Sequence, residues 1–154
     1  MSTNGIKRIS ENRQARHLYF ILEKYEAGIS LQGNEVKSIR LGHVNLKDSW
    51  CDIEEGELFI KGMHISTYEK DGLSRTDPIR VRKLLMHKQE IYHLFGKVKQ
   101  DGLTLIPTLL YFKDSKVKVE VSLCKGKKLY DKRQSSAERD AQRQVRRALK
   151  IEQN

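Results

Sequence analysis

The alternation KVKVEVSLC in residues 116–124 constrains the fold more than any other feature of this sequence. Apolar side chains at positions 117, 119, 121 and 123 alternate with polar ones at 118, 120 and 122. This period of two predicts a β-strand with one face on a core and the other face wet or in contact with a ligand.

Other segments predict a sheet around this strand and two helices. Extended structure is expected over 17–31 and 103–112, with a hairpin over 52–62 that turns at Glu55 and Gly56. A short helix is expected over Gly33–Arg40, and a second one from Asp77 and Pro78 to a stop at Gly96. We therefore expect a mainly β fold with helices, a closed or half-closed β-barrel of the oligonucleotide-binding type.

Charge divides the chain into a body, residues 1–125, and a basic tail, residues 126–154. Lys and Arg number 30 against 20 Asp and Glu, a net charge of +10. The tail has nine Lys or Arg and four Asp or Glu, which is half of this excess. Such a surplus favours a polyanionic partner, most often nucleic acid, although a basic protein without one is the alternative.

The tail has a helical composition but little apolar surface. Ser135 and Glu138 have capping-box spacing, and a thin stripe follows at Ala137, Ala141, Val145 and Leu149. Because this stripe offsets little of the ordering cost, we expect a tail that is disordered alone and folds on a partner. A C-terminal helix docked on its own barrel is the alternative.

The sequence gives little support for an enzyme. Its five histidines are scattered, and Cys51 and Cys124 form neither a disulfide framework nor a zinc motif, which predicts two buried thiols in a reducing cytosol. No catalytic or metal-binding residue and no cofactor is therefore assigned. We expect a cytoplasmic monomer without a signal peptide, a transmembrane segment or a membrane partner.

Three basic segments could bind nucleic acid. In the first, four polar residues precede the aromatic residues Tyr19, Phe20 and Tyr25: Asn12, Arg13, Arg16 and His17. We expect Phe20 in the core, and Glu26 is unusual beside these cations. The second segment, Arg80, Arg82 and Lys83, lies at the start of the expected second helix, where a solvated face is the alternative.

The third basic segment, KGKKLYDKR at 125–133, has the highest density of residues suited to nucleic-acid binding. Its cations suit phosphates, Gly126 permits close backbone approach, and Tyr130 offers a ring to a base.

Five segments together resemble the SmpB family of bacterial SsrA-binding proteins. They are NRQARHLYFI (12–21), EAGISLQGNEVKSIR (26–40), DPIRVRKLL (77–85), GLTLIPTLLYF (102–112) and KGKKLYDKR (125–133). The resemblance implies an oligonucleotide-binding-type barrel and a non-enzymatic adaptor of trans-translation. Such an adaptor binds the tRNA-like domain of transfer-messenger RNA (tmRNA) and delivers it to stalled 70S ribosomes, so that the nascent peptide is tagged for degradation. Elongation factor Tu, with alanyl-tmRNA, is implied as an indirect partner.

The resemblance also implies two sets of site residues. The RNA-binding set is Asn12, Arg13, Arg16, His17, Glu26, Leu85, Lys118 and Lys125. The set at the ribosomal decoding centre is Gly126, Lys127, Lys128, Tyr130, Asp131, Lys132 and Arg133, and a helix from about Ser135 would follow the empty mRNA channel along small-subunit rRNA. Some family members have histidine at position 130, and our hypothesis is that stacking of the ring is what matters there. A general RNA binder and a metal-dependent RNA-processing enzyme are the competing interpretations.

Overall fold

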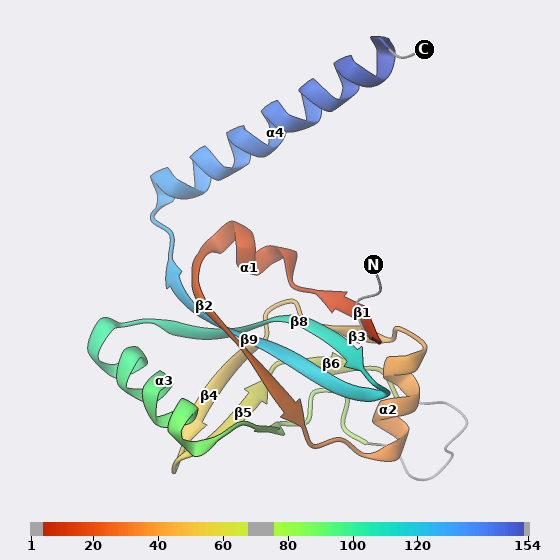
Figure 1. Cartoon of the computed structure of the whole chain (residues 1–154), viewed down its shortest axis with the longest axis vertical. Helices are drawn as coiled ribbons and strands as arrows, with labels where there is room; N and C mark the ends of the chain where they lie inside the picture. The colour runs from red at the N-terminus through yellow and green to blue at the C-terminus, as the bar shows by residue number, and fades with distance from the viewer. Residues whose placement is uncertain (1–4, 68–75, 153–154) are drawn as a thin grey trace.

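Antiparallel strands form most of the fold in a computed structural model that describes residues 5–67 and 76–152 (Figure 1). The elements in chain order are β1 (Ile6–Glu11), α1 (Arg13–Leu18), β2 (Tyr19–Ile29), α2 (Gly33–Arg40), β3 (Val44–Asn45), β4 (Trp50–Glu54), β5 (Glu57–Lys61), β6 (His64–Ile65), β7 (Arg82–Leu85), α3 (Lys88–Asp101), β8 (Thr104–Lys113), β9 (Lys116–Gly126) and α4 (Leu129–Glu152).

Strand β9 closes a ring of strands. It pairs with β8 along one edge and with β2 along the other, and the order β8-β4-β5-β7-β2-β9 returns to β8. The predicted hairpin is present: β4 and β5 turn at Glu55 and Gly56, which have the positive φ values of 52° and 77° that such tight turns need. The prediction of a mainly β fold with helices is thereby confirmed.

The core lies inside this ring. Val119, Val121 and Leu123 of β9 are buried there, as the alternation predicted. Helices α2 and α3 lie at opposite ends of the sheet, with α3 at the left in Figure 1, and each adds apolar side chains such as Ile39 and Leu94 to the same core.

The outward face of β9 is only partly wet, which differs from the expectation. Ser122 and Cys124 on that face are fully buried. Ala15 of α1 packs with Ile106 and Cys124 in a second, small apolar cluster. Helix α1 therefore covers one end of this face and leaves the other end open. Cys51 is buried like Cys124, as predicted.

The expected helix from Asp77 to Gly96 is wrong in its first half. Asp77 and Pro78 begin a turn, in which the Asp77 carboxylate accepts a hydrogen bond from the Ile79 backbone N–H at 3.0 Å. Residues 82–85 then form strand β7, whose burial alternates with a period of two. Helix α3 begins only at Lys88 and runs through Gly96 to Gly102, a left-handed C-cap with φ 63°.

Two other boundaries differ from prediction. His17 and Leu18 belong to α1, because the Asn12 side chain caps a helical turn before β2 begins at Tyr19. Helix α4 begins at Leu129, six residues before the predicted start at Ser135. No glycine or proline follows Gly126 in the sequence, so nothing local stops the helix from starting earlier.

A buried ion pair explains why 82–85 is a strand. The Arg82 side chain is fully buried, and its Nε donates to Glu35 Oε2 at 2.6 Å while its Nη1 donates to the Met63 carbonyl at 2.9 Å. Arg80 Nη2 donates to the other Glu35 oxygen at 2.5 Å. Burial raises the pKa of Glu35, but these hydrogen bonds outweigh it and hold the pKa below its usual value.

These contacts correct the expectation for the second basic segment. Arg80 and Arg82 serve the fold rather than a helix N-terminus, and Lys83 pairs with Glu57 at 3.1 Å on the surface.

Glu35→Gln should lower the free energy of unfolding by about 3–5 kcal/mol, because it leaves the buried Arg82 charge without a counter-charge. Urea unfolding followed by circular dichroism measures this loss. Glu57→Gln, which breaks the exposed pair with Lys83, is the matched control and should cost less than about 1 kcal/mol. Equal losses of unfolding free energy in the two variants would contradict the claim that the buried Glu35 ion pair stabilises the fold more than the exposed Glu57 pair does.

Candidate nucleic-acid interface

Asn12 anchors helix α1 to the sheet. Its side chain is buried; Oδ1 accepts from the Ala15 N–H at 3.2 Å, and Nδ2 donates to the carbonyls of Pro107 at 3.1 Å and Leu46 at 3.3 Å. Because Oδ1 and Nδ2 are both hydrogen-bonded within the protein, the Asn12 side chain positions the helix that carries the cations.

Three basic side chains of the predicted RNA-binding set follow on α1. Arg13 and Arg16 are exposed and His17 is half-buried. Arg16 forms an ion pair with Glu11 at 3.0 Å that is open to solvent, so the pair contributes little to stability. Exchanging such a contact for a phosphate therefore costs little.

Helix α4 touches the body at α1. Arg139 Nη2 lies 2.9 Å from His17 Nδ1, and a cavity of about 190 Å³ lined by these two residues, Arg16, Glu138 and Gln142 remains between the helices. The stripe residues Ala137, Ala141 and Val145 are all exposed. These three residues of the apolar stripe are therefore not used for docking on the body, and the side chain of the fourth, Leu149, lies outside the described part of the structure.

Lys127 connects the start of the tail to α1 and β2. Its backbone N–H donates to the Leu18 carbonyl at 2.9 Å, and its Nζ donates to the Arg16 carbonyl at 3.1 Å. The same Nζ lies 5.1 Å from the centroid of the Phe20 ring. Phe20 is 43% exposed, so the expectation of a core residue was wrong.

The structure describes the predicted tail set only in part. Lys125 and Gly126 end strand β9, with Lys125 opposite Phe20 of β2. Lys128 and Arg133 are exposed. The side chains of Tyr130, Asp131 and Lys132 lie outside the described part of the structure, and only their backbone in α4 is described.

A tyrosine hydroxyl and neighbouring lysines stabilise the ionised carboxylate of Glu26. Tyr111 Oη donates to Glu26 Oε2 at 2.5 Å, and Lys113 Nζ lies 3.4 Å from Oε1. The hydrogen bond from Tyr111 is the main cause that lowers the pKa of Glu26, and Lys113 and Lys118 add to it. Glu26 is therefore an ionised acceptor held in place on an exposed surface.

Leu85 and Lys118 lie on the two sides of Gly28, near Glu26. Gly28 is opposite Leu85 of β7 and also opposite Lys118 of β9. A Cβ on Gly28 would lie 3.3 Å from the Leu85 Cβ, so the glycine lets this exposed leucine lie against the strand.

The predicted RNA-binding set thus falls into two groups, one near each end of β2. The α1 group contains Asn12, Arg13, Arg16, His17 and Lys125, and the Glu26 group contains Glu26, Leu85 and Lys118. The six residue steps of β2 from Phe20 to Glu26 separate them by about 20 Å, and this spacing suits a structured RNA that is contacted at two places.

The described residues contain neither a cluster of metal ligands nor a helix that could span a membrane. In the ranges 5–67 and 76–152, no three His, Cys, Asp or Glu side chains are grouped so that they could hold a metal ion. No helix in these ranges is long and apolar enough to cross a membrane.

Comparison with known proteins identifies the family. A family model described as SmpB protein matches residues 9–151. The chain belongs to the SmpB family. The SsrA-binding protein of Carboxydothermus hydrogenoformans is 59% identical, with 94% of this chain and 97% of that protein covered. The SsrA-binding protein of Caldicellulosiruptor bescii is 57% identical, with 96% and 93% covered.

A solved structure is similar as well. It is described as "tmRNA-SmpB: a journey to the center of the bacterial ribosome", and the match has a TM-score of 0.66, 48% identity, and coverage of 81% of this chain and 86% of that chain. The fold and the sequence of this SmpB-family member therefore point to the same relatives.

Sequence reasoning missed Tyr111, Lys113 and Arg139. Tyr111 is 85 positions from Glu26, and only the pairing of β8 with β9 and of β9 with β2 brings them together. The strand registers would have indicated this contact. Lys118 of β9 lies opposite Tyr111 of β8 on one side and opposite Gly28 of β2 on the other, and Gly28 is two residues from Glu26.

Tyr111→Phe should raise the pKa of Glu26 toward its usual value of 4.5, because it removes the hydrogen bond that stabilises the carboxylate. NMR titration of the Glu26 carboxyl carbon measures the shift. Tyr25→Phe, which removes the corresponding hydrogen bond to Glu23, is the control and should leave Glu26 unchanged. An unchanged pKa in Tyr111→Phe would contradict this account of the Glu26 group.

Proposed function

We propose that this protein is the RNA-binding adaptor of trans-translation. It binds the tRNA-like domain of tmRNA and brings it to ribosomes stalled on mRNAs without a stop codon, where the nascent peptide is tagged for degradation. The observation that carries the proposal is a match to SsrA-binding proteins over almost the whole chain, at 59% identity in one of them.

The body is the RNA-binding unit of this adaptor, an oligonucleotide-binding-type barrel over residues 1–125. The closed strand ring, with a helix at each end, supports this assignment. The α1 group supplies the cations for phosphates, and the Glu26 group supplies an acceptor and an apolar contact. Glu26 accepts hydrogen bonds from donors of the RNA, since its charge is already balanced by neighbouring lysines.

The tail, residues 126–154, serves the ribosome. Its stripe and its cations face solvent over residues 137–147, which leaves them available to a surface formed by rRNA. Gly126, Lys127, Lys128, Tyr130, Asp131, Lys132 and Arg133 are assigned to the decoding centre, and the rest of α4 to the empty mRNA channel.

In this role the protein is a non-enzymatic cytoplasmic monomer without metal or cofactor. Elongation factor Tu, which carries alanyl-tmRNA, meets it through the RNA. In this proposal the RNA and the ribosome carry out the reaction, and the protein binds both of them.

Full-length protein and a version ending at Lys125 should both prefer the tRNA-like domain of tmRNA over an ordinary tRNA at near-physiological salt. Fluorescence titrations at low and high salt measure the preference and the slope of log K against log salt. Each phosphate contact that is lost would reduce the slope by about 0.9. Because the proposal assigns the tail to the ribosome and not to this RNA, removal of its nine Lys and Arg should leave the slope nearly unchanged.

Three results would overturn the proposal. Equal affinity for both RNAs in the full-length protein would make it a general RNA binder. Loss of the preference together with the tail would move RNA selection away from the body. Cleavage of either RNA in the presence of Mg²⁺ or Mn²⁺ would instead identify an RNA-processing enzyme.

A further inference from the structure

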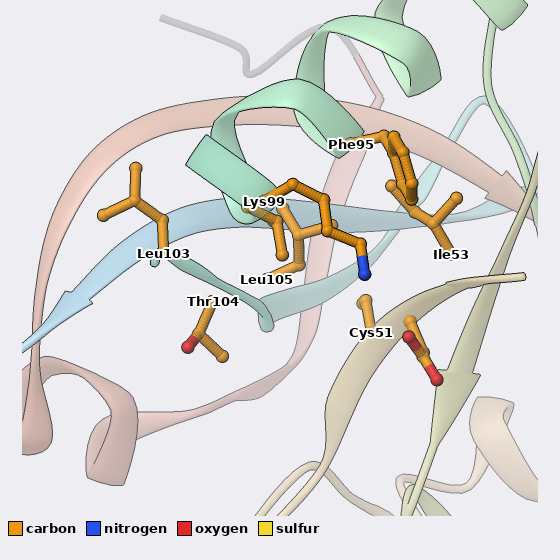
Figure 2. Close-up of a pocket in the computed structure, with 9 residues that line it drawn as sticks. Cys51, Ile53, Phe95, Lys99, Leu103, Thr104 and Leu105 are labelled. Atoms are coloured by element: carbon orange, nitrogen blue, oxygen red, sulfur yellow. The ribbon is translucent and has the colours of Figure 1, made fainter. Parts of the chain in front are cut away.

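A cavity of about 440 Å³ lies between α3 and the adjacent ends of β4 and β8 (Figure 2). This volume is within the range of roughly 300–1,000 Å³ that is typical of small-molecule sites. Ile53 and Leu103 provide apolar walls, Cys51 lies at the base, and Phe95 and Lys99 project from α3. None of these five residues belongs to the α1 group or the Glu26 group.

The side chains of α3 at this cavity have the chemistry of a nucleotide site. The Phe95 ring is 42% exposed although it is large and apolar. Lys99 Nζ lies 5.6 Å from the centroid of that ring, and in Figure 2 it extends across the cavity toward β4. An open ring and a neighbouring cation are what an unstacked base and its phosphate require.

The acidic residue of the cavity forms an ion pair with a lysine. Asp52 lines the cavity, but its Oδ2 lies 3.0 Å from Lys61 Nζ, and hydrogen bonding to Lys61 is the main cause that lowers its pKa. Lys61 also pairs with Glu54, so the two carboxylates share one cation within the β4–β5 hairpin. Burial raises the pKa of the Cys51 thiol, so that the base of the cavity is neutral. Among the residues that line the cavity, Lys99 carries the positive charge that an RNA phosphate would meet.

A second cavity shares one wall with this one on the side of α1. Thr104, at the start of β8, lines it and also lines a second cavity of about 380 Å³ whose other walls include Asn12, Tyr19 and Trp50. Trp50 is 45% exposed at this point. One residue of β8 therefore separates the surface beneath α1 from the cavity beneath α3.

We propose that the α3 cavity binds an unstacked base of a single-stranded RNA segment that continues from the α1 group. The base stacks on Phe95 and its phosphate pairs with Lys99. This inference rests on the proposed RNA-binding function and adds a second, single-strand contact to it. RNA is favoured over an apolar peptide because the cavity carries an exposed cation beside its ring in a chain with a net charge of +10.

The test uses a fluorescently labelled seven-nucleotide single-stranded RNA of mixed sequence and the full-length protein. Phe95→Leu keeps an apolar side chain but removes the stacking ring, and it should weaken binding about tenfold in an anisotropy titration. Lys99→Ala should lower the slope of log K against log salt by about 0.7, because one phosphate contact on a single strand is lost.

Tyr92→Leu is the matched control. Tyr92 is another exposed aromatic residue of α3, at 67%, and it does not line the cavity. Its replacement should leave the affinity unchanged, and circular dichroism melting of all three variants verifies that each is folded.

Unchanged affinity in Phe95→Leu, or an equal loss in Tyr92→Leu, would overturn the inference. The unmodified protein is titrated in parallel against the tRNA-like domain of tmRNA and an ordinary tRNA. If it prefers the tRNA-like domain while Phe95→Leu has no effect on the single strand, the cavity inference fails alone. If the unmodified protein shows no preference, the proposed function fails.

Discussion

The pairing of β9 along both of its edges is the constraint on which the rest of this structure depends. Because β8 and β2 both bond to it, the apolar side chains of β9 are enclosed in a ring, and its other face points outward. That outward face carries Lys118 and contacts α1. The last residues of the same strand lead into the tail. A single strand thus joins the core, the candidate RNA surface and α4.

Electrostatic pairing separates the cations that stabilise the fold from those that are available for RNA. Arg82 and Arg80 are bound to Glu35, and the Glu35–Arg82 pair is buried. Arg13 and Lys125 lie on the exposed surface near α1. The sequence alone does not distinguish these roles, because all of these residues occur in similar basic segments.

The predictions succeeded where a signal was local. The alternation at 117–123, the turn at Glu55 and Gly56, and the helix Gly33–Arg40 all follow from neighbouring residues. They failed where a distant contact decided the structure. Arg82 requires Glu35, which is 47 positions away, and this pairing turns an apparent helical stripe into strand β7. Phe20 is exposed beside Lys127, and the Tyr111–Glu26 contact depends on the registers of two strand pairs. The site residues implied by the family resemblance remain predictions, and the structure shows how they are grouped.

Hydrogen–deuterium exchange of the full-length protein, with and without the tRNA-like domain of tmRNA, tests the central claim most directly. The account predicts that bound RNA slows exchange in α1 and in the strands of the Glu26 group, β2, β7 and β9, and leaves α4 unchanged. The claim that β9 divides an RNA-binding body from a tail that serves the ribosome would be contradicted by protection concentrated in α4 with none in α1 or β2.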